Sequence, residues 1–378
     1  MTSTQPAYSL QNPFPWYDAL RAQSPIMRDP KSGLCMVFGY GDVQRTLSDW
    51  KAFSSERGRP RGENAQNALS SSIISTDPPR HRQLRSLVEQ AFTPKQVRAL
   101  EPRIAELVDE LLSKVEGSGS MDFVHEFAYP LPVILIAEIL GIPAADRDAF
   151  KRWSDAVVTG DQSGSREMGA YFARLIEQRR ADPADDLISG LLAAQLDGEN
   201  LDTQELLGFC ILLLVAGNET TTNLLTNTLL CWQDAPEAYD RVRADRALLP
   251  GTTEEVLRYR SPVQSMYRVA AQDVELGGQL IPEGSPVLAW IGSANRDPVQ
   301  FPEAGTFDPG RTPNRHLAFG NGVHFCLGAP LARLEASVAL GALLDRLPNL
   351  RVAPGAVLEP IPSQVVYGVK RLPVLFGQ

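Results

Sequence analysis

Residues 319–328 read FGNGVHFCLG and are the most informative stretch of this chain. Three glycines in it allow the backbone to fold closely around one point, where side chains would otherwise collide. Cys326 stands just before a helix that is expected to start near Ala329 and Pro330. Backbone N–H groups and the positive end of that helix stabilise a thiolate. The pattern therefore predicts an electron-rich sulfur held in a tight loop.

A thiolate is the soft, electron-donating ligand that haem iron takes where cleavage of an O–O bond must be favoured. The other three cysteines, Cys35, Cys210 and Cys231, stand in no comparable pattern and form no CxxC pair. We expect these three to be small buried side chains in a reducing compartment, and we expect neither a zinc cluster nor a disulfide framework.

Composition narrows the class of protein. The chain has 378 residues, of which 43% are hydrophobic and 21% charged, as in an ordinary folded protein. Its formal net charge of -9 argues against a broad nucleic-acid-binding surface, which needs an excess of basic residues. The longest apolar run, 206–217, is shorter than the ~20 residues that span a bilayer. Since no basic and apolar leader opens the sequence, we expect a cytoplasmic protein without a membrane segment.

Apolar residues at steps of three and four predict a mainly α-helical chain. The helical stretches are 94–115, 133–140, 145–160, 166–180, 203–230, 236–243, 252–259 and 330–346. The strand signals are a hairpin at 26–38 and strands at 266–269, 274–281 and 287–291. Periodicity is lost from 293 to 325, and a coil this long usually has a function. The pattern predicts one large, mainly α unit with small β-sheets.

A second informative stretch, AGNETTT at 216–222, directly follows the apolar run. Polar residues there are costly to bury without partners, yet apolar residues resume at Leu224. Gly217 weakens the helix, and threonine hydroxyls can bond to preceding carbonyls, so we expect a local kink or bulge. Such a distortion makes room for a small molecule beside an acid, Glu219, and an alcohol, Thr220.

Two further patterns concern charged side chains. Glu255 and Arg258 are three residues apart, so they share one helix face and can form an ion pair.

In DPPRHRQLR, residues 77–85, the aspartate and prolines favour a helix start, and His81 and Arg85 fall on the apolar face of that helix. Because an inward-facing charge needs an anionic partner, this face predicts a nearby anion.

Taken together, these motifs resemble those of the cytochrome P-450 family of haem-thiolate monooxygenases. Residues 319–328 match the family's FGxGxHxCxG signature at every fixed position, and AGNET and EVLR resemble its AGxET and ExxR motifs. The resemblance covers essentially the whole chain and is strongest to short, soluble bacterial and archaeal members. It implies the cytochrome P-450 fold, with the haem between a long distal helix and the helix of the cysteine loop. It also implies one haem domain over residues 1–378, with no fused reductase.

The resemblance implies a role for each motif residue. Cys326 would be the axial iron ligand of haem b, and Phe319 would pack against its loop. Glu219 and Thr220 would relay protons during oxygen activation. The residues implied to flank the haem are Ala216 and Gly217.

Other implied roles are structural or electrostatic. Glu255 and Arg258 would bind a third residue, Arg311 of the following coil, and so hold the cysteine loop in place. The cations implied for the haem propionates are His81, Arg85, Arg268 and His324. The remaining histidines, His125 and His316, are interpreted as ordinary polar residues.

The implied reaction inserts one atom of O2 into a lipophilic small molecule. Electrons would come from NAD(P)H through a separate ferredoxin- or flavodoxin-type protein, and the enzyme would be a monomer without nucleic-acid or membrane partners.

The electron-donor protein is expected to dock on the cysteine side of the haem, at Arg82, Arg103 and Arg333. The parts of the chain expected to line the substrate site are the segments 57–75, 150–175, 262–266 and 365–367, together with Leu212, Val215 and Ala216. Two alternatives stay open: a peroxide-driven peroxygenase, and a non-catalytic haem protein that senses or carries a ligand.

Overall fold

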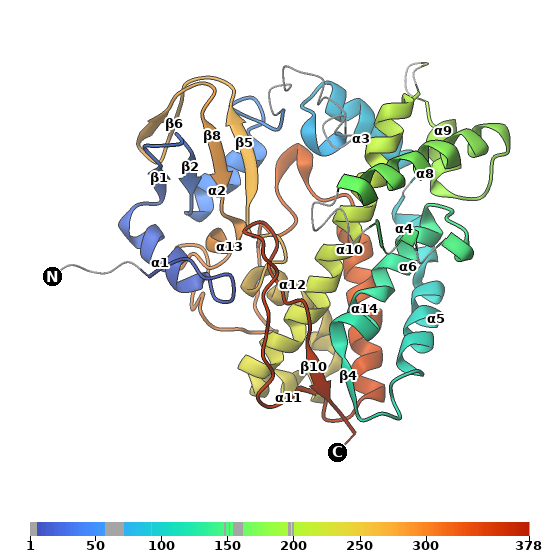
Figure 1. Cartoon of the computed structure of the whole chain (residues 1–378). Helices are drawn as coiled ribbons and strands as arrows, with labels where there is room; N and C mark the ends of the chain where they lie inside the picture. The colour runs from blue at the N-terminus through green and yellow to red at the C-terminus, as the bar shows by residue number, and fades with distance from the viewer. Residues whose placement is uncertain are drawn as a thin grey trace. The chain divides into compact units, whose positions relative to one another are not determined.

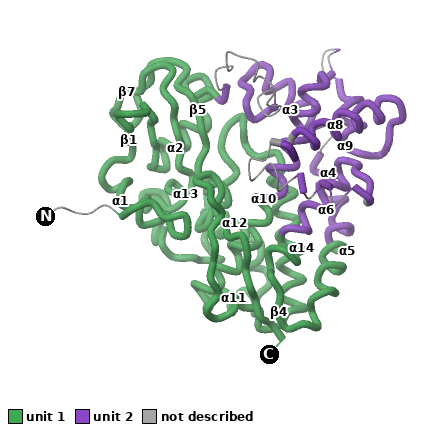
Figure 2. Tube along the Cα trace, in the orientation of Figure 1, with its two compact units in different colours: residues 1–54, 105–128, 220–378 green, residues 55–104, 129–219 purple. Residues whose placement is uncertain are grey.

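The structure is a computed structural model that describes residues 6–56, 72–91, 93–146, 149–150, 152–153, 162–195, 198 and 200–377. The chain divides into two compact units (Figure 2). Unit 1 comprises residues 1–54, 105–128 and 220–378, and unit 2 comprises residues 55–104 and 129–219. Helices dominate both units, and the sheets are small (Figure 1), as predicted.

The largest sheet of unit 1 has five strands in the order β1-β2-β8-β5-β3. These strands are β1 (Ile26–Arg28), β2 (Cys35–Val37), β8 (Pro286–Ala289), β5 (Met266–Ala270) and β3 (Phe53–Ser54). β1 and β2 form the predicted hairpin, and Gly33, with a φ of +71°, lies in its turn. β2 pairs with β8 in parallel, whereas β8 pairs with β5 antiparallel. The N-terminal hairpin is therefore joined to strands from the second half of the chain.

Two smaller sheets complete the β-structure of unit 1 among the described residues. β6 (Val274–Leu276) and β7 (Gln279–Ile281) form a hairpin across Gly277 and Gly278, so the strand predicted at 274–281 is two strands. The other sheet has the order β4-β10-β9 and was not predicted from the sequence. Its strands are β4 (Ser120–Asp122), β10 (Pro373–Leu375) and β9 (Arg351–Val352).

The helices that position the cysteine loop belong to unit 1, where α12 packs against α14. The helices of this unit are α1 (Phe14–Gln23), α2 (Tyr40–Ser48), α11 (Pro236–Ala244), α12 (Leu249–Tyr259), α13 (Ile291–Ala294) and α14 (Ala329–Arg346). Ile291 begins α13 and does not end a strand, which corrects the predicted strand boundary. Aromatic side chains of α1 form a buried cluster with Phe38, Trp290 and Tyr367.

Unit 2 is helical, and its α9 packs against both α3 and α8. Its helices are α3 (Arg80–Ala91), α4 (Pro94–Ala99), α6 (Pro130–Ile139), α8 (Gln162–Ala181) and α9 (Leu187–Ala193). Two helices contribute residues to both units: α5 (Glu101–Leu112) and α10 (Thr203–Asp234). Short 3-10 or π turns are η2 (Ile73–Ser75), η3 (Val124–Ala128), η4 (Ala144–Asp146), η5 (Arg246–Leu248) and η6 (Gly322–His324).

The helix predicted over 94–115 is two helices, α4 and α5. It begins where predicted, because Thr93 caps α4 in a capping box with Gln96. The break follows from Pro102, which lacks the N–H that would bond to the carbonyl four residues earlier and whose ring crowds that carbonyl. Of the helix predicted at 145–160, residues 147, 148, 151 and 154–160 lie outside the described residues.

Candidate functional site

The cysteine loop lies between a long coil and the start of α14. Gly320 and Gly322 have φ angles of +73° and +74°, which residues with a side chain rarely adopt. The Cys326 N–H donates to the Phe319 carbonyl across 2.8 Å, so the loop closes on itself around the cysteine. A Cβ atom on Gly322 would lie 2.7 Å from the Cα atom of Ser48, so the loop lies directly against the end of α2. Backbone geometry thus requires glycine at two positions of the signature.

Cys326 differs from the other three cysteines in its exposure. Its side chain is half-buried, whereas Cys35, Cys210 and Cys231 are buried, as predicted for them. Burial raises the pKa of Cys231 to about 12, and it also raises the pKa of Cys35 and of Cys210. These three thiols therefore stay protonated at neutral pH, and Cys326 is the cysteine whose sulfur a ligand could reach.

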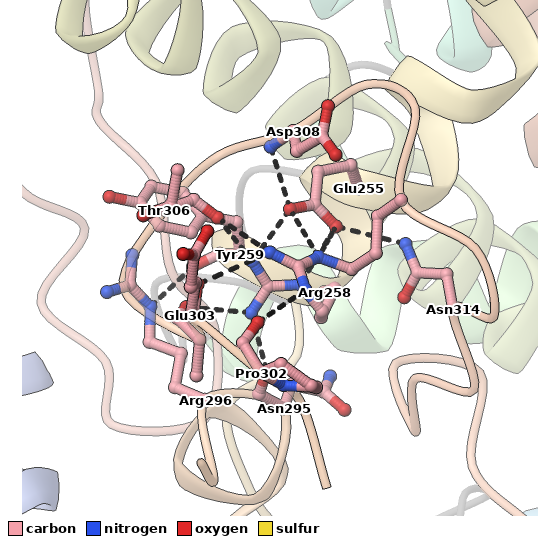
Figure 3. Close-up of polar contacts among 12 residues, drawn as sticks. Glu255, Arg258, Tyr259, Asn295, Arg296, Pro302, Glu303, Thr306, Asp308 and Asn314 are labelled. Carbon is pink, nitrogen blue, oxygen red and sulfur yellow. Dashed lines mark hydrogen bonds and ion pairs between the residues drawn. The ribbon is translucent and has the colours of Figure 1, made fainter.

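Glu255 and Arg258 of α12 form an ion pair whose side chains have no exposed surface (Figure 3). Arg258 Nη2 donates to Glu255 Oε1 at 2.7 Å, and Arg258 Nε donates to Glu255 Oε2 at 2.8 Å. Arg311 of the coil donates from Nε to the same two oxygens, at 3.1 and 3.2 Å. Glu255 therefore binds both arginines with which it was predicted to be grouped.

This buried cluster fixes the coil that leads to the cysteine loop. Glu255 also accepts hydrogen bonds from the Asp308 N–H and from the Asn314 side-chain amide, both at 3.0 Å. The Arg258 guanidinium donates to three backbone carbonyls of the coil, those of Asn295, Ala304 and Thr306. Removing one partner from such a buried pair costs about 3–5 kcal/mol. The cluster therefore strongly favours one path of the coil.

Asn295 also belongs to this arrangement and was not predicted as a site residue. Its Oδ1 accepts a hydrogen bond from the Leu317 N–H at 2.7 Å, and its Nδ2 donates to the Ser261 hydroxyl at 2.8 Å. The side chain thus joins the end of α12 to the residues just before the signature. An asparagine in a coil gives no spacing signal, because its partners come from distant segments.

Glu254, the residue before Glu255, binds a different set of partners. Arg333 of α14 donates to it from Nε at 2.7 Å and from Nη2 at 2.8 Å. The ring of His316 lies 3.1 Å from the same carboxylate and is only 4% exposed. His316 is therefore a buried polar side chain bound to an acid, a contact that was not predicted, whereas His125 is exposed and lies beside Asp122.

The residues predicted to face the reacting oxygen lie on α10, which is α-helical from Thr203 to Asp234. The kink or bulge expected at Gly217 does not interrupt this helix. A Cβ atom on Gly217 would lie 3.0 Å from Ile136 Cδ1, so glycine there allows α6 to approach closely. Ala216 is exposed in this apolar stretch, and Glu219 and Thr220 are half-buried. Threonine back-bonding occurs further along, where Thr226 donates to the Thr222 carbonyl.

The four predicted propionate cations lie in different units. In unit 2, His81 of α3 is 1% exposed, and Arg85 binds Glu89 across 2.7 Å from Nε to Oε1. In unit 1, Arg268 of β5 is 5% exposed and donates to the Tyr267 carbonyl, and His324 ends η6 beside Cys326. We predicted an anionic partner for Arg85 from its position on the apolar face of the helix. Glu89 is at least one such partner.

Two of the segments predicted to line the substrate site are neighbours in unit 1. The Gln264 N–H donates to the Val365 carbonyl at 2.7 Å, and the Tyr367 N–H donates to the Pro262 carbonyl at 2.9 Å. Tyr367 itself is buried and its hydroxyl accepts a hydrogen bond from Arg260, so its ring belongs to the aromatic cluster. Predicted lining residues 57–71 and 154–161 lie outside the described residues.

The donor set of unit 1 fits a haem iron. The loop offers one soft sulfur ligand from a half-buried thiol, and Arg333 is close enough to Cys326 for their charges to interact. A neighbouring guanidinium favours a thiolate over a thiol, which is the form that binds metals. Cys326 would hold the iron, and His324 and Arg268 are side chains of the same unit that can donate hydrogen bonds to an anionic group. Among the described residues, none of the helices combines the length and apolar character needed to traverse a bilayer.

Comparison with known proteins agrees with this chemistry. The family model described as cytochrome P-450 matches residues 164–374. Cytochrome P-450 109 of Bacillus spizizenii is 46% identical over 96% of this chain and 91% of its own length. The cytochrome P-450 monooxygenase PikC of Streptomyces venezuelae is 41% identical over the same shares of the two chains.

Solved structures agree as well. The crystal structure of substrate-free CYP109E1 from Bacillus megaterium superposes with a TM-score of 0.93 at 44% identity, covering 97% of this chain and 99% of that one. The same enzyme in complex with testosterone gives a TM-score of 0.90 at 43% identity, covering 97% and 100%. With a family model over more than half of the residues and relatives above 40% identity along nearly the whole length, this chain belongs to the cytochrome P-450 family of haem-thiolate monooxygenases.

Proposed function

We propose that this chain is a haem b monooxygenase that inserts one atom of O2 into a lipophilic small molecule. Its electrons come from NAD(P)H through a separate ferredoxin- or flavodoxin-type protein, and residues 1–378 act as one monomeric haem domain. The observation that carries the proposal is the closed loop around Cys326, with glycines at +73° and +74° and a buried ionic cluster that fixes the coil before it.

Haem, when bound, supplies the reductive activation of O2 that amino-acid side chains cannot perform. Cys326 would hold the iron as a thiolate, the ligand type that favours O–O cleavage at a haem. Thr220 of α10 donates its hydroxyl proton, and Glu219, the preceding residue, supplies the proton that replaces it. His81, Arg85, Arg268 and His324 are the proposed partners of the propionates, and Phe319, Ala216 and Gly217 the proposed neighbours of the macrocycle.

The lipophilic character of the substrate is supported by a relative and by the predicted lining. CYP109E1 of Bacillus megaterium has been crystallised with testosterone. In this chain the predicted lining is mainly apolar, both in the segment 262–266 and in the neighbouring residues Val365 and Val366. Pockets of this composition bind apolar molecules with a few polar anchors. Steroids are therefore the first compounds to test.

The proposed docking of the electron donor rests on fewer cations than the sequence suggested. Arg103 is paired with Glu138 across 2.9 Å, and Arg333 is paired with Glu254. Each pair is close to neutral overall, whereas Arg82 is exposed on α3. If an acidic donor binds near Arg82, its electron transfer should slow as salt rises, and Arg82→Glu should slow it further. Arg82→Lys is the matched control and should retain the rate of the parent.

The absorption spectrum of the dithionite-reduced, carbon monoxide-bound protein tests the proposal. Thiolate ligation requires a strongly red-shifted Soret band, and a folded, haem-loaded protein without that band would refute it. Addition of steroids should then shift the spin state of the ferric protein. Turnover with NAD(P)H and a ferredoxin system, compared with turnover driven by hydrogen peroxide alone, separates the monooxygenase from a peroxygenase. A protein that binds ligands but supports neither reaction would instead be a haem sensor or carrier.

A further inference from the structure

Unit 1 contains a second ionic cluster beside that of Glu255, and the known motifs do not account for it. We call it the Glu254 cluster; its members are Glu254, His316, Phe319 and Arg333. It joins three segments: α12, the coil just before the signature, and α14. His316 is almost fully buried, and the side chains of Glu254 and Arg333 are 30% and 40% exposed. The cluster therefore lies at the edge of the protein core and not wholly in water.

Arg333 and His316 both lie against the ring of Phe319. The Arg333 guanidinium carbon is 4.6 Å from the centroid of that ring, within the range of a cation–π contact. The centroid of the His316 ring is 5.9 Å from the same point. Phe319 in turn accepts the hydrogen bond from the Cys326 N–H at 2.8 Å. One side chain and one hydrogen bond thus connect the guanidinium to the cysteine.

Glu254 and Arg333 are both charged at neutral pH. Burial disfavours the charged form of Glu254, but the hydrogen bonds from Arg333 and His316 outweigh burial and lower its pKa to about 2. The bond to Glu254 also raises the pKa of Arg333, which is close enough to Cys326 for their charges to interact. The positive charge of Arg333 therefore lies on the side chain of the residue that binds the Cys326 N–H, and the negative charge of Glu254 partly neutralises it.

We propose that Arg333, held by Glu254, is a positioning residue that sets the reduction potential of the iron bound to Cys326. The inference rests on the proposed function. A positive charge beside the sulfur draws electron density away from the metal and so favours the reduced iron. Glu254 limits this effect because its negative charge offsets that of the guanidinium. The pair also keeps Phe319 in place against the loop.

Reduction potentials of haem-loaded variants test the inference. Arg333→Gln removes the positive charge, leaves Glu254 in contact with His316 but without the guanidinium, and should shift the potential to a more negative value than that of the parent. Glu254→Gln leaves the guanidinium uncompensated and should shift the potential to a more positive value. The two substitutions break the same ion pair, so a merely structural role would shift both variants in the same direction. Opposite shifts are the result expected.

Two further variants complete the experiment. Arg346→Gln removes a guanidinium from the far end of the same helix, where it binds Asp109 and Glu116, and should leave the potential unchanged. Arg333→Lys retains the charge without the two-point contact and should stay near the parent value. If Arg333→Gln does not retain haem, the positive shift of Glu254→Gln and the parent-like value of Arg333→Lys decide the question.

Shifts of Glu254→Gln and Arg333→Gln in the same direction, or values equal to the parent, would overturn the inference. Failure of the proposed function is recognised separately, from a parent protein that lacks the red-shifted Soret band. A parent that has the band, with variants that do not show opposite shifts, refutes the role of Arg333 alone.

Discussion

Glu254 and Glu255 are consecutive residues of α12, yet their carboxylates bind arginines on different parts of the chain: Glu254 binds Arg333 of α14, and Glu255 binds Arg258 and Arg311. Neighbouring side chains on a helix point about 100° apart, so consecutive residues of one helix can bind partners on two different segments. The two glutamates thereby tie the chain before Cys326 and the chain after it to the same support.

Arg258→Gln is expected to lower the free energy of unfolding by about 3–5 kcal/mol, because Glu255 then stays buried with a weaker set of partners. Urea denaturation followed by circular dichroism measures this loss. Arg346→Gln, which removes ion pairs near the surface, serves as the matched control and should cost about 1 kcal/mol or less. Similar losses for the two variants would show that burial adds nothing to the pair.

Cys326→Ser should bind haem weakly and lose monooxygenase activity, because a hydroxyl is a poor substitute for a soft thiolate ligand. The carbon monoxide-bound, reduced protein should then lack the red-shifted Soret band. Cys35→Ala, which alters a buried cysteine of β2, is the control and should retain the band. Full activity in purified Cys326→Ser would remove this residue from the ligand position.

Thr220→Ala should bind haem and substrate and accept electrons normally, but a smaller share of those electrons should lead to product. Without a positioned hydroxyl, O–O cleavage becomes harder and hydrogen peroxide is released, so product per NAD(P)H falls and peroxide rises. Glu219→Gln should differ, because it removes the proton supply further back and should slow total turnover. Product and peroxide are measured per NAD(P)H consumed.

The control for Thr220 is Thr226→Ala on the same helix. Thr226 donates to the Thr222 carbonyl across 2.7 Å, so its loss should cost about 1 kcal/mol of stability and leave coupling intact. If Thr220→Ala behaves in the same way, Thr220 only satisfies a backbone group and has no part in proton delivery.

Glu335 of α14 should make the protein less stable as pH rises from about 5 to 8. The side chain is 1% exposed, and its Oε2 atom has no hydrogen-bond partner among the described residues. Burial raises its pKa from 4.5 to about 8, so the folded protein keeps a proton that the unfolded chain loses. Between these two pKa values, folding stability falls by about 1.4 kcal/mol per pH unit.

Glu335→Gln should flatten that dependence, because an amide replaces the neutral acid without a proton to lose. Thermal or urea unfolding at pH 5, 6, 7 and 8 measures the slope for each variant. The exposed Glu237 of α11 supplies the control, and Glu237→Gln should retain the slope of the parent. An equal slope in Glu335→Gln and the parent would mean that Glu335 is ionised in the folded protein.

Local signals in the sequence predicted much of the structure. The start of α4 follows from Thr93 and Pro94, and the hairpin of β1 and β2 follows from a turn with Gly33 between short apolar runs. The contact of Glu255 with Arg258 follows from helix geometry alone, since residues three apart share a face. Arg311 was found only through the resemblance to a family, because no spacing rule connects a helix to a coil residue so far away.

Features that depend on distant contacts were missed. The short strands β4, β9 and β10 contain two or three residues each, too few for a periodic signal, and they exist because they pair with one another. The burial of His316 depends on its packing beside Glu254, which nothing in its own neighbourhood indicates. The break at Leu100 was missed because the apolar period continues through it, while Pro102 decides the backbone.

The parallel pairing of β2 with β8 has a consequence for how the protein is made. Cys35 lies opposite Val287, about 250 residues later, and Gly322 of the signature lies against Ser48 near the start of the chain. A ribosome delivers the N-terminal residues first, so this hairpin and α2 leave the exit tunnel long before the segments that pack on them. In each newly made chain the edge of β2 therefore stays unpaired until the segment of β8 has emerged, and α2 stays uncovered until residues 319–328 have emerged.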